Sequence, residues 1–216
     1  TGVRLTTGDA LLRGGCLKHF SDDDYDPALY EKILAADKAN LQVMIHAIGN
    51  RANDVVLTIF ERVAKINGAK DRRFRIEHAH NVRAEDLKRF GNSKIIASMQ
   101  PHLFFGGEPY RDLLNSGAVL AFGSDASITD FNPLYGIHAA VNYGEQAISV
   151  EEAVRAYTVG SAYAEFQENV KGSISIGKLA DMIILSDDIF SVNPSRITET
   201  KVLTTIMDGK IVYQFK

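Results

Sequence analysis

Three short apolar runs in this chain end in the same way, and this recurrence limits its fold more than any other feature. Residues 41–47, 73–80 and 118–125 each have the length of a β-strand, and each leads through a His or an Asp into a turn that contains Gly or Asn. Helical patterns separate the runs, so strand and helix alternate along the chain. Such alternation is typical of a parallel sheet built from βα units.

Capping residues and glycines give the expected boundaries of the helices. Ser149 and Glu152 form a capping box at the start of one helix. Asn53 is expected to cap another, and Gly91 to stop a third. The predicted helices are 27–40, 54–67, 84–90, 110–115, 133–142, 151–158 and 162–168. Further strands are predicted at 14–20, 95–100, 181–185, 202–207 and 210–215.

Composition and charge narrow the classes of function. With 216 residues, 45% of them hydrophobic, the chain can bury the core of one large domain or of a domain with a small appendage. The net charge of −3 and the pI near 6.1 give no basic stripe, so no nucleic-acid partner is expected. No apolar run reaches the roughly 18 to 20 residues that span a bilayer, so no membrane partner is expected. Cys16 stands alone, which excludes an internal disulfide framework and agrees with a cytoplasmic protein.

The texture of the chain changes near residue 171. Strands and helices alternate up to Asp125 and helical patterns follow to residue 170, whereas from 171 to 216 glycines separate β-rich runs. We therefore expect a barrel-type α/β domain over residues 1–170 and a small β-subdomain over residues 171–216.

The polar residues that end the recurrent runs are candidates for a metal site. His46, His78 and Asp125 all lie at predicted carboxyl ends of strands, and such ends meet at one side of a parallel sheet or barrel. Taken singly, each has a structural explanation, a hydrogen-bonded His or a helix cap; their joint occurrence favours a site. His80 forms an H-x-H pair with His78, and spacing alone leaves open whether it binds metal, contacts substrate or supports the structure.

Five motifs follow one another along this chain: IHAIGNRA (45–52), RIEHA (75–79), SMQP (98–101), FGSD (122–125) and GKLAD (177–181). With these motifs the chain resembles the amidohydrolase superfamily, and more narrowly its YtcJ-like branch of metal-dependent hydrolases. The resemblance implies a partial TIM (β/α)8 barrel, strands four to eight, with a small β-sandwich subdomain at the C-terminus.

The resemblance also implies roles for individual residues. His46, His78 and Asp125 match metal ligands of the family, and Asp125 matches its general base as well. Lys18 is a poor ligand as a cation, but it matches a lysine that related enzymes carboxylate so that it bridges two metals. The candidates for substrate contact are His80, Gln100 and His102.

Together these residues predict a hydrolase that acts on a carbon–nitrogen bond of a non-peptide amide through metal-activated water. The expected cofactor is one or two divalent ions, zinc in preference. The expected partners are a small-molecule substrate and, as a further option, a second copy of the chain in a homodimer.

Two alternatives stay open. The family's H-x-H pair of strand one, and strands one to three, have no counterpart here. The chain is therefore expected to be a fragment or a string of ordered segments, and a catalytically incomplete barrel with an assembly or regulatory role is one alternative. The other keeps the metal but changes the reaction to ester hydrolysis or isomerisation.

Overall fold

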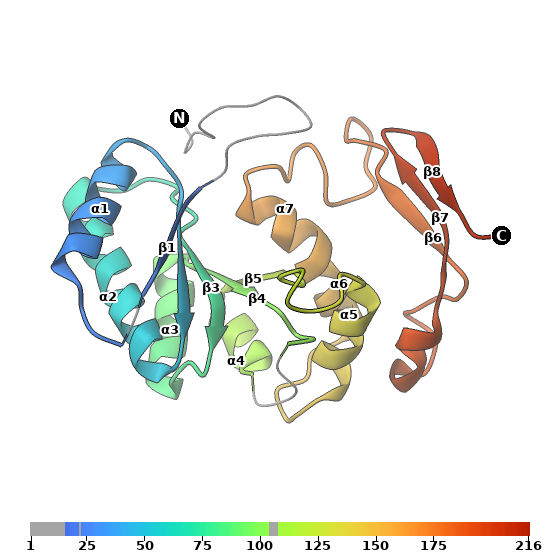
Figure 1. Cartoon of the computed structure of the whole chain (residues 1–216), viewed down its shortest axis with the longest axis horizontal. Coiled ribbons are helices and arrows are strands. Elements are labelled where there is room, and N and C mark those ends of the chain that lie inside the picture. Colours follow the sequence, from blue (N-terminus) through green and yellow to red (C-terminus); the bar gives the residue numbers. More distant parts are fainter. Residues whose placement is uncertain (1–15, 22, 104–107) are drawn as a thin grey trace. The chain divides into compact units, whose positions relative to one another are not determined.

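The computed structural model describes residues 16–21, 23–103 and 108–216, and it divides into two compact units (Figure 1). The first unit runs to Met99 and also contains Arg111–Leu120. The second unit comprises Gln100–Tyr110 and Ala121–Lys216. Because this division follows compactness alone, the domain boundary expected after residue 170 stays a prediction.

A parallel sheet forms the centre of the first unit. Its strands pair in the order of the sequence, and the pairs β1–β2, β2–β3 and β3–β4 are parallel. The strands are β1 (Leu17–Phe20), β2 (Val43–Ile48), β3 (Arg75–His80), β4 (Ile96–Met99) and β5 (Val119–Phe122). The connecting helices are α1 (Pro27–Lys38), α2 (Asn50–Asn67), α3 (Ala84–Ser93) and α4 (Tyr110–Asn115). Sequential order without a reversal is the pattern of a (β/α) barrel and confirms the predicted alternation.

The helices α1, α2 and α3 lie along one face of the strands β1 to β3 (Figure 1). Val43, Ile45 and Ala47 of β2 are fully buried, whereas Met44 and His46, which alternate with them, keep part of their surface exposed. Alternate residues of a strand point to opposite faces of the sheet. The helix-covered face therefore forms the core, and the opposite face carries the predicted site residues of β1 and β2.

In the first unit, the expected cap of α2 and the expected end of α3 are wrong, and both errors concern residues that serve tertiary packing. Helix α2 begins at Asn50 behind Gly49, so Asn53 lies inside the helix and does not cap it. Helix α3 continues through Gly91 to Ser93, and Lys94 caps it in a left-handed conformation. A Cβ atom at Gly91 would lie 1.8 Å from the carbonyl oxygen of Ser116, so this glycine permits a close approach of backbones instead of stopping the helix.

Helices and a small antiparallel sheet make up the second unit. The predicted capping box is confirmed, since Ser149 and Glu152 exchange both of its hydrogen bonds. The helices are α5 (Pro133–Asn142), α6 (Val150–Arg155), a π-helical turn (Ala156–Gly160), α7 (Ser161–Ala164) and a 3₁₀ helix (Pro194–Glu199). The sheet has the order β6 (Met182–Leu185), β7 (Val202–Met207) and β8 (Lys210–Gln214). Among the residues that the structure describes, no helix has the length and apolarity needed to cross a bilayer.

Candidate metal centre

His46 and His78 lie side by side at the carboxyl ends of β2 and β3. Their ring centroids are 4.4 Å apart and the ring planes meet at 69°. The strand register pairs His46 with Glu77 and Ala47 with His78, so the two histidines stand one position apart on adjacent strands. Zinc binds His nitrogens at about 2.0 to 2.1 Å, and neighbouring rings at this spacing can each offer a nitrogen to one ion.

Lys18 on β1 contacts Phe20, and Phe20 in turn contacts His46 of this pair. Its Nζ atom lies 5.5 Å from the centroid of the Phe20 ring, and that ring lies 4.9 Å from the ring of His46. An ammonium group is attracted by an aromatic face but has no lone pair for a metal. The predicted role of Lys18 as a ligand therefore requires its carboxylated form.

The histidine pair is only part of a ligand set. Within the described stretches of the chain, no group of three or more His, Cys, Asp or Glu side chains is arranged to hold a metal ion. Zinc in proteins usually has three or four protein ligands. The donor chemistry of the pair fits a divalent ion, and the complete set predicted from Lys18, His46, His78 and Asp125 stays a prediction.

The backbone of β3 is strained at the histidine that it delivers. His78 and Ala79 have φ angles of 73° and 49°, in the left-handed region that residues with a side chain seldom adopt. The register shifts here, because Ala47 pairs with His78 but the next residue, Ile48, pairs with His80. Strain of this kind corresponds to about 1 to 3 kcal/mol per residue and clusters at functional sites. The extra residue is a bulge of the type that redirects a side chain.

His80 is buried at the far side of this bulge. Its residue surface is 0% exposed, and its backbone carbonyl accepts a hydrogen bond of 3.0 Å from the amide of Gly49. Gly49 has φ 103° and ψ 153°, a combination that is essentially restricted to glycine. The burial of the His80 side chain favours a supporting role over substrate contact.

Glu77, which is not among the residues predicted for the site, is a buried carboxylate near the histidines. It pairs with Arg75 at 2.7 Å and accepts a hydrogen bond of 2.9 Å from the Ser98 hydroxyl. The register places Glu77 opposite His46 on β2 and opposite Ser98 on β4. Arg75 and Glu77 are two residues apart on one strand and carry opposite charges, so the sequence could have predicted an ion pair on one face of that strand.

The nearby thiol of Cys16 is not set up as a nucleophile. Burial raises the pKa of the Cys16 thiol, and the positive charge of Arg75 only partly offsets that effect. A thiol whose pKa is raised stays protonated near neutral pH, and the thiolate is the form that attacks or binds metal. We therefore assign no chemistry to Cys16.

Asp125 lies in the turn after β5, in the second unit. The strand ends at Phe122, three residues earlier than the run predicted for it, and Asp125 is exposed with φ 54°. The turn is held by local bonds: the Ile128 amide donates to the Asp125 carbonyl at 2.7 Å, and the Thr129 hydroxyl donates to the Ser124 carbonyl at 2.5 Å. The carboxylate is thus presented on a loop, not on a strand.

The candidates for substrate contact in the second unit differ in exposure. Gln100 is buried, and its carbonyl accepts a hydrogen bond of 3.0 Å from the amide of Leu103. His102 is half-buried, and its ring lies 5.3 Å from the ring of Tyr135 on α5. No contact of either residue decides its role, so both assignments stay predictions.

A mainly apolar cavity of about 1240 Å³ lies within the second unit. Its walls come from α5, from the π-helical turn and from the antiparallel sheet, and they include Ile137, Tyr157 and Ile183. Gly123 and Ser124, which precede Asp125, lie at its edge. Burial raises the pKa of the Tyr157 phenol, so this group stays neutral at physiological pH.

The comparison with known families covers nearly all of the chain. Residues 7–213 match the family described as "Amidohydrolase family". The chain belongs to this amidohydrolase family. The family assignment made from the five motifs is confirmed.

Individual relatives place this amidohydrolase chain in the YtcJ-like branch. It is 41% identical over 207 residues to "Protein LONG AFTER FAR-RED 3" of Arabidopsis thaliana, covering 83% of this chain and 35% of that protein. It is 30% identical over 217 residues to "Putative amidohydrolase YtcJ" of Bacillus subtilis, covering 88% and 40%. It is 27% identical over 252 residues to "N-substituted formamide deformylase" of Arthrobacter pascens, covering 94% and 46%. The chain thus spans less than half the length of each relative.

A solved structure supports the same fold. The chain is similar to an uncharacterized metal-dependent hydrolase from Pyrococcus horikoshii, with a TM-score of 0.73 and 28% identity. The match covers 89% of this chain and 48% of that one. The predicted fold is therefore confirmed: the amidohydrolase chain forms part of a (β/α)8 barrel together with a small β-subdomain.

Proposed function

We propose that the protein is a metal-dependent hydrolase that cleaves a carbon–nitrogen bond in a small, non-peptide amide. The observation that carries the proposal is the pair of imidazole rings, 4.4 Å apart, at the ends of adjacent parallel strands. Membership of the amidohydrolase family supports the reaction class. The likeness to a formamide deformylase supports an amide-type bond as the one that is cleaved.

The two histidines, Lys18 and Asp125 would hold the cofactor, and Asp125 would also move the proton. His46 and His78 would each give one ring nitrogen, and a carboxylated Lys18 would add an anionic oxygen. Bound there, one or two divalent ions, preferably zinc, would supply Lewis acidity that polarises a carbonyl and lowers the pKa of water toward roughly 7. Asp125 would take a proton from water and pass it to the leaving nitrogen. His80, Gln100 and His102 would support the site or orient the substrate.

The test uses the protein at its full natural length. Its metal content is measured after purification, and hydrolysis is assayed on N-substituted formamides, simple amides and esters before and after chelation. The proposal expects bound metal, loss of amide hydrolysis on chelation and recovery with zinc. A protein without metal that stays inactive when zinc or manganese is added would refute it and would favour the non-catalytic assembly or regulatory role.

The same panel separates the reaction classes. Ester turnover that exceeds amide turnover would replace the proposed reaction with ester hydrolysis, and isomerised product would replace it with isomerisation. We also propose that the protein works in the cytoplasm, since its single cysteine needs no oxidising compartment. A homodimer stays a prediction, which the molecular mass in solution tests.

A further inference from the structure

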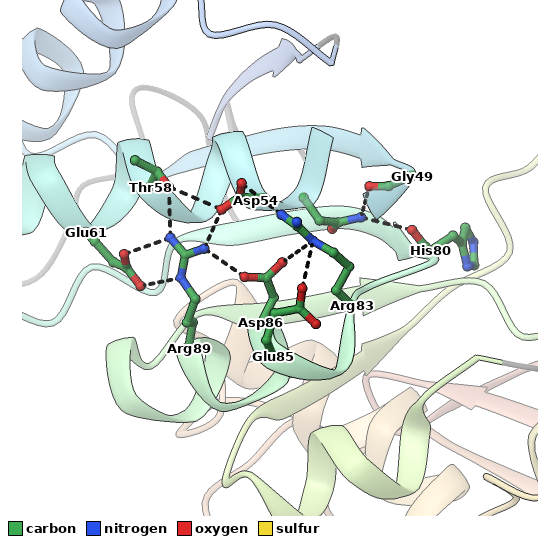
Figure 2. Close-up of polar contacts among 10 residues, drawn as sticks. Gly49, Asp54, Thr58, Glu61, His80, Arg83, Glu85, Asp86 and Arg89 are labelled. Atoms are coloured by element: carbon green, nitrogen blue, oxygen red, sulfur yellow. Dashed lines mark hydrogen bonds and ion pairs between the residues drawn. The ribbon is translucent and has the colours of Figure 1, made fainter. Parts of the chain in front are cut away.

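Asn53 lies inside α2 and connects the ends of the two strands that carry the histidines. Its side-chain Nδ2 donates one hydrogen bond of 2.9 Å to the Gly49 carbonyl and another of 2.9 Å to the His80 carbonyl. Figure 2 shows both bonds as the dashed lines that reach Gly49 and His80. Both acceptors are carbonyl oxygens, so the amide has only one orientation that avoids oxygen facing oxygen.

The His80 carbonyl receives a second hydrogen bond at the same point. The backbone amide of Gly49, one residue beyond β2, donates to it at 3.0 Å. Asn53 and Gly49 therefore tie the end of β2 to the end of β3 immediately after His46 and His78. We call this set of three hydrogen bonds, among Gly49, Asn53 and His80, the strand-end clamp.

The strand-end clamp acts on the strained segment of β3. His78 and Ala79 have left-handed backbones, and such conformations persist only where the surrounding structure holds them. The bulge is fixed on one side by the pairing of Ala47 with His78, and on the other by the clamp at the His80 carbonyl. If the clamp is removed, the bulge can relax toward an ordinary strand. A strand that slips by one residue turns its side chains to the other face.

Asn53 carries a cost that a purely structural residue at this place would avoid. Its residue surface is 0% exposed, yet Oδ1 has no hydrogen-bond partner among the residues that the structure describes. A buried polar atom without a partner destabilises a fold, and an apolar side chain would remove that penalty. An asparagine at this position nevertheless provides the two N–H donors of Nδ2, which an apolar side chain would lack.

Ion pairs next to Asn53 hold this part of helix α2 in place. The next residue, Asp54, pairs with Arg83 at 2.8 Å and with Arg89 at 2.7 Å (Figure 2). Arg89 also pairs with Glu61 at 2.8 Å, and its hydrogen bonds hold the pKa of Asp54 below the usual range. Single exposed ion pairs contribute little, but here shared partners connect α2 to α3 at the level of the clamp.

We propose that Asn53 is a positioning residue for the histidine pair. Through the strand-end clamp it holds the bulge of β3, and so keeps the rings of His46 and His78 at the spacing that one metal ion requires. The metal part of this proposal rests on the proposed function. The clamp itself does not, because it concerns only the described backbone and Asn53.

The experiment compares Asn53→Ala with a matched control, Asn67→Ala, in the full-length protein. Asn67 lies at the other end of the same helix, and its Nδ2 also makes two bonds, 3.1 Å to the Leu34 carbonyl and 2.8 Å to Asp37. The readouts are the hydrogen-exchange rate of the Gly49 amide and the zinc dissociation constant measured against a competing chelator. Thermal unfolding shows whether the two variants lose comparable stability.

Asn53→Ala is expected to speed exchange at Gly49 by at least about tenfold and to weaken zinc binding by about 10- to 100-fold, the usual effect of removing a supporting residue. Asn67→Ala is expected to change neither by more than about twofold. Asn53→Asp, which has the same size but no Nδ2 donor, is expected to behave like Asn53→Ala. Equal exchange and equal zinc affinity in the Asn53 and Asn67 variants would overturn the proposal.

Two further outcomes are decided in advance. If Asn53→Ala does not fold, Asn53→Ser keeps one donor, and the same comparison with Asn67→Ala applies to it. If the unaltered protein binds no metal and stays inactive with added zinc or manganese, the proposed function fails, and exchange at Gly49 alone then supports or overturns the clamp.

Discussion

The end of β3 and the turn after β5 supply different parts of the proposed chemistry, and they are built in different ways. His78 is buried, has a left-handed backbone and is followed by a carbonyl that two donors from another strand end and another helix hold. Asp125 is exposed, and the bonds from the Ile128 amide to its carbonyl and from the Thr129 hydroxyl to the Ser124 carbonyl lie within the same turn. Two histidines that share a metal ion need fixed positions, whereas a carboxylate on a loop can adjust as it carries a proton to the substrate.

Replacing His78 should give the largest effect, because it removes a ligand from the rigid end. We expect His78→Ala to lower kcat/KM by at least about 10⁴-fold, as when one member of a catalytic unit is lost, with the fold retained. The matched control is His138→Ala on α5; the His138 ring contacts Tyr143 and lies outside the predicted site. Metal content and turnover of both variants check the expectation. Unchanged metal stoichiometry in His78→Ala would contradict the ligand assignment.

Replacing Asp125 should give the next largest effect, and it should act on turnover more than on stability. We expect Asp125→Asn to lower kcat by about 10²- to 10⁴-fold, the range for loss of general base catalysis. The unfolding temperature should hardly change, since the side chain is exposed. Asp130→Asn, in the same loop, is the control. If Asp125→Asn kept full kcat, the loop carboxylate would not be the proton carrier.

A substitution of Glu77 tests whether the stability of β3 depends on the buried ion pair of Glu77 with Arg75. Glu77→Gln leaves Arg75 without its charged partner, and we expect a loss of about 1 to 3 kcal/mol in the free energy of unfolding, since Arg75 is 18% exposed and not fully buried. Glu199→Gln removes an exposed partner of Arg196, and its effect should lie within about 1 kcal/mol. Denaturant unfolding measures both. Equal losses would mean that burial of the Arg75 pair has no energetic consequence.

A substitution of Thr129 tests the turn that contains Asp125, and it should give the smallest effect. Thr129→Val removes the hydroxyl that donates to the Ser124 carbonyl, and we expect a loss of about 0.5 to 1.5 kcal/mol with unchanged zinc affinity. Ser195→Ala, which loses a local hydroxyl bond to Asn193, serves as the control. A large fall in zinc affinity in Thr129→Val would show that the turn is as tightly coupled to metal binding as the end of β3.

Local patterns in the sequence predicted most of the elements, because their causes are local. The capping box of Ser149 and Glu152 lies within one helical turn, and the alternation of strand and helix follows from nearby apolar residues. The helix predicted over 151–158 gives way to a π-helical turn after Arg155, and the helix predicted over 162–168 already ends at Ala164. The turn includes Tyr157, which lines the cavity of the second unit, and its surroundings come from distant segments.

The candidate site divides in the same way. His46 and His78 could be selected from sequence because each ends an apolar run, and the structure adds that they stand one position apart in the register with their rings 4.4 Å apart. Glu77 was missed, because its partners Arg75 and Ser98 had first to be placed on neighbouring positions of the sheet. The roles of Lys18, Asp125, Gln100 and His102 stay predictions.

The sequence by itself determined the family, the order of strands and helices and the residue types that can bind a metal. Only the tertiary structure decided what Gly91 and Asn53 do. The first meets the carbonyl of Ser116, and the second holds the carbonyl of His80. A glycine or an asparagine has the same local propensity whether it ends a helix or contacts a distant backbone. Its role is therefore fixed by the partner that folding brings to it.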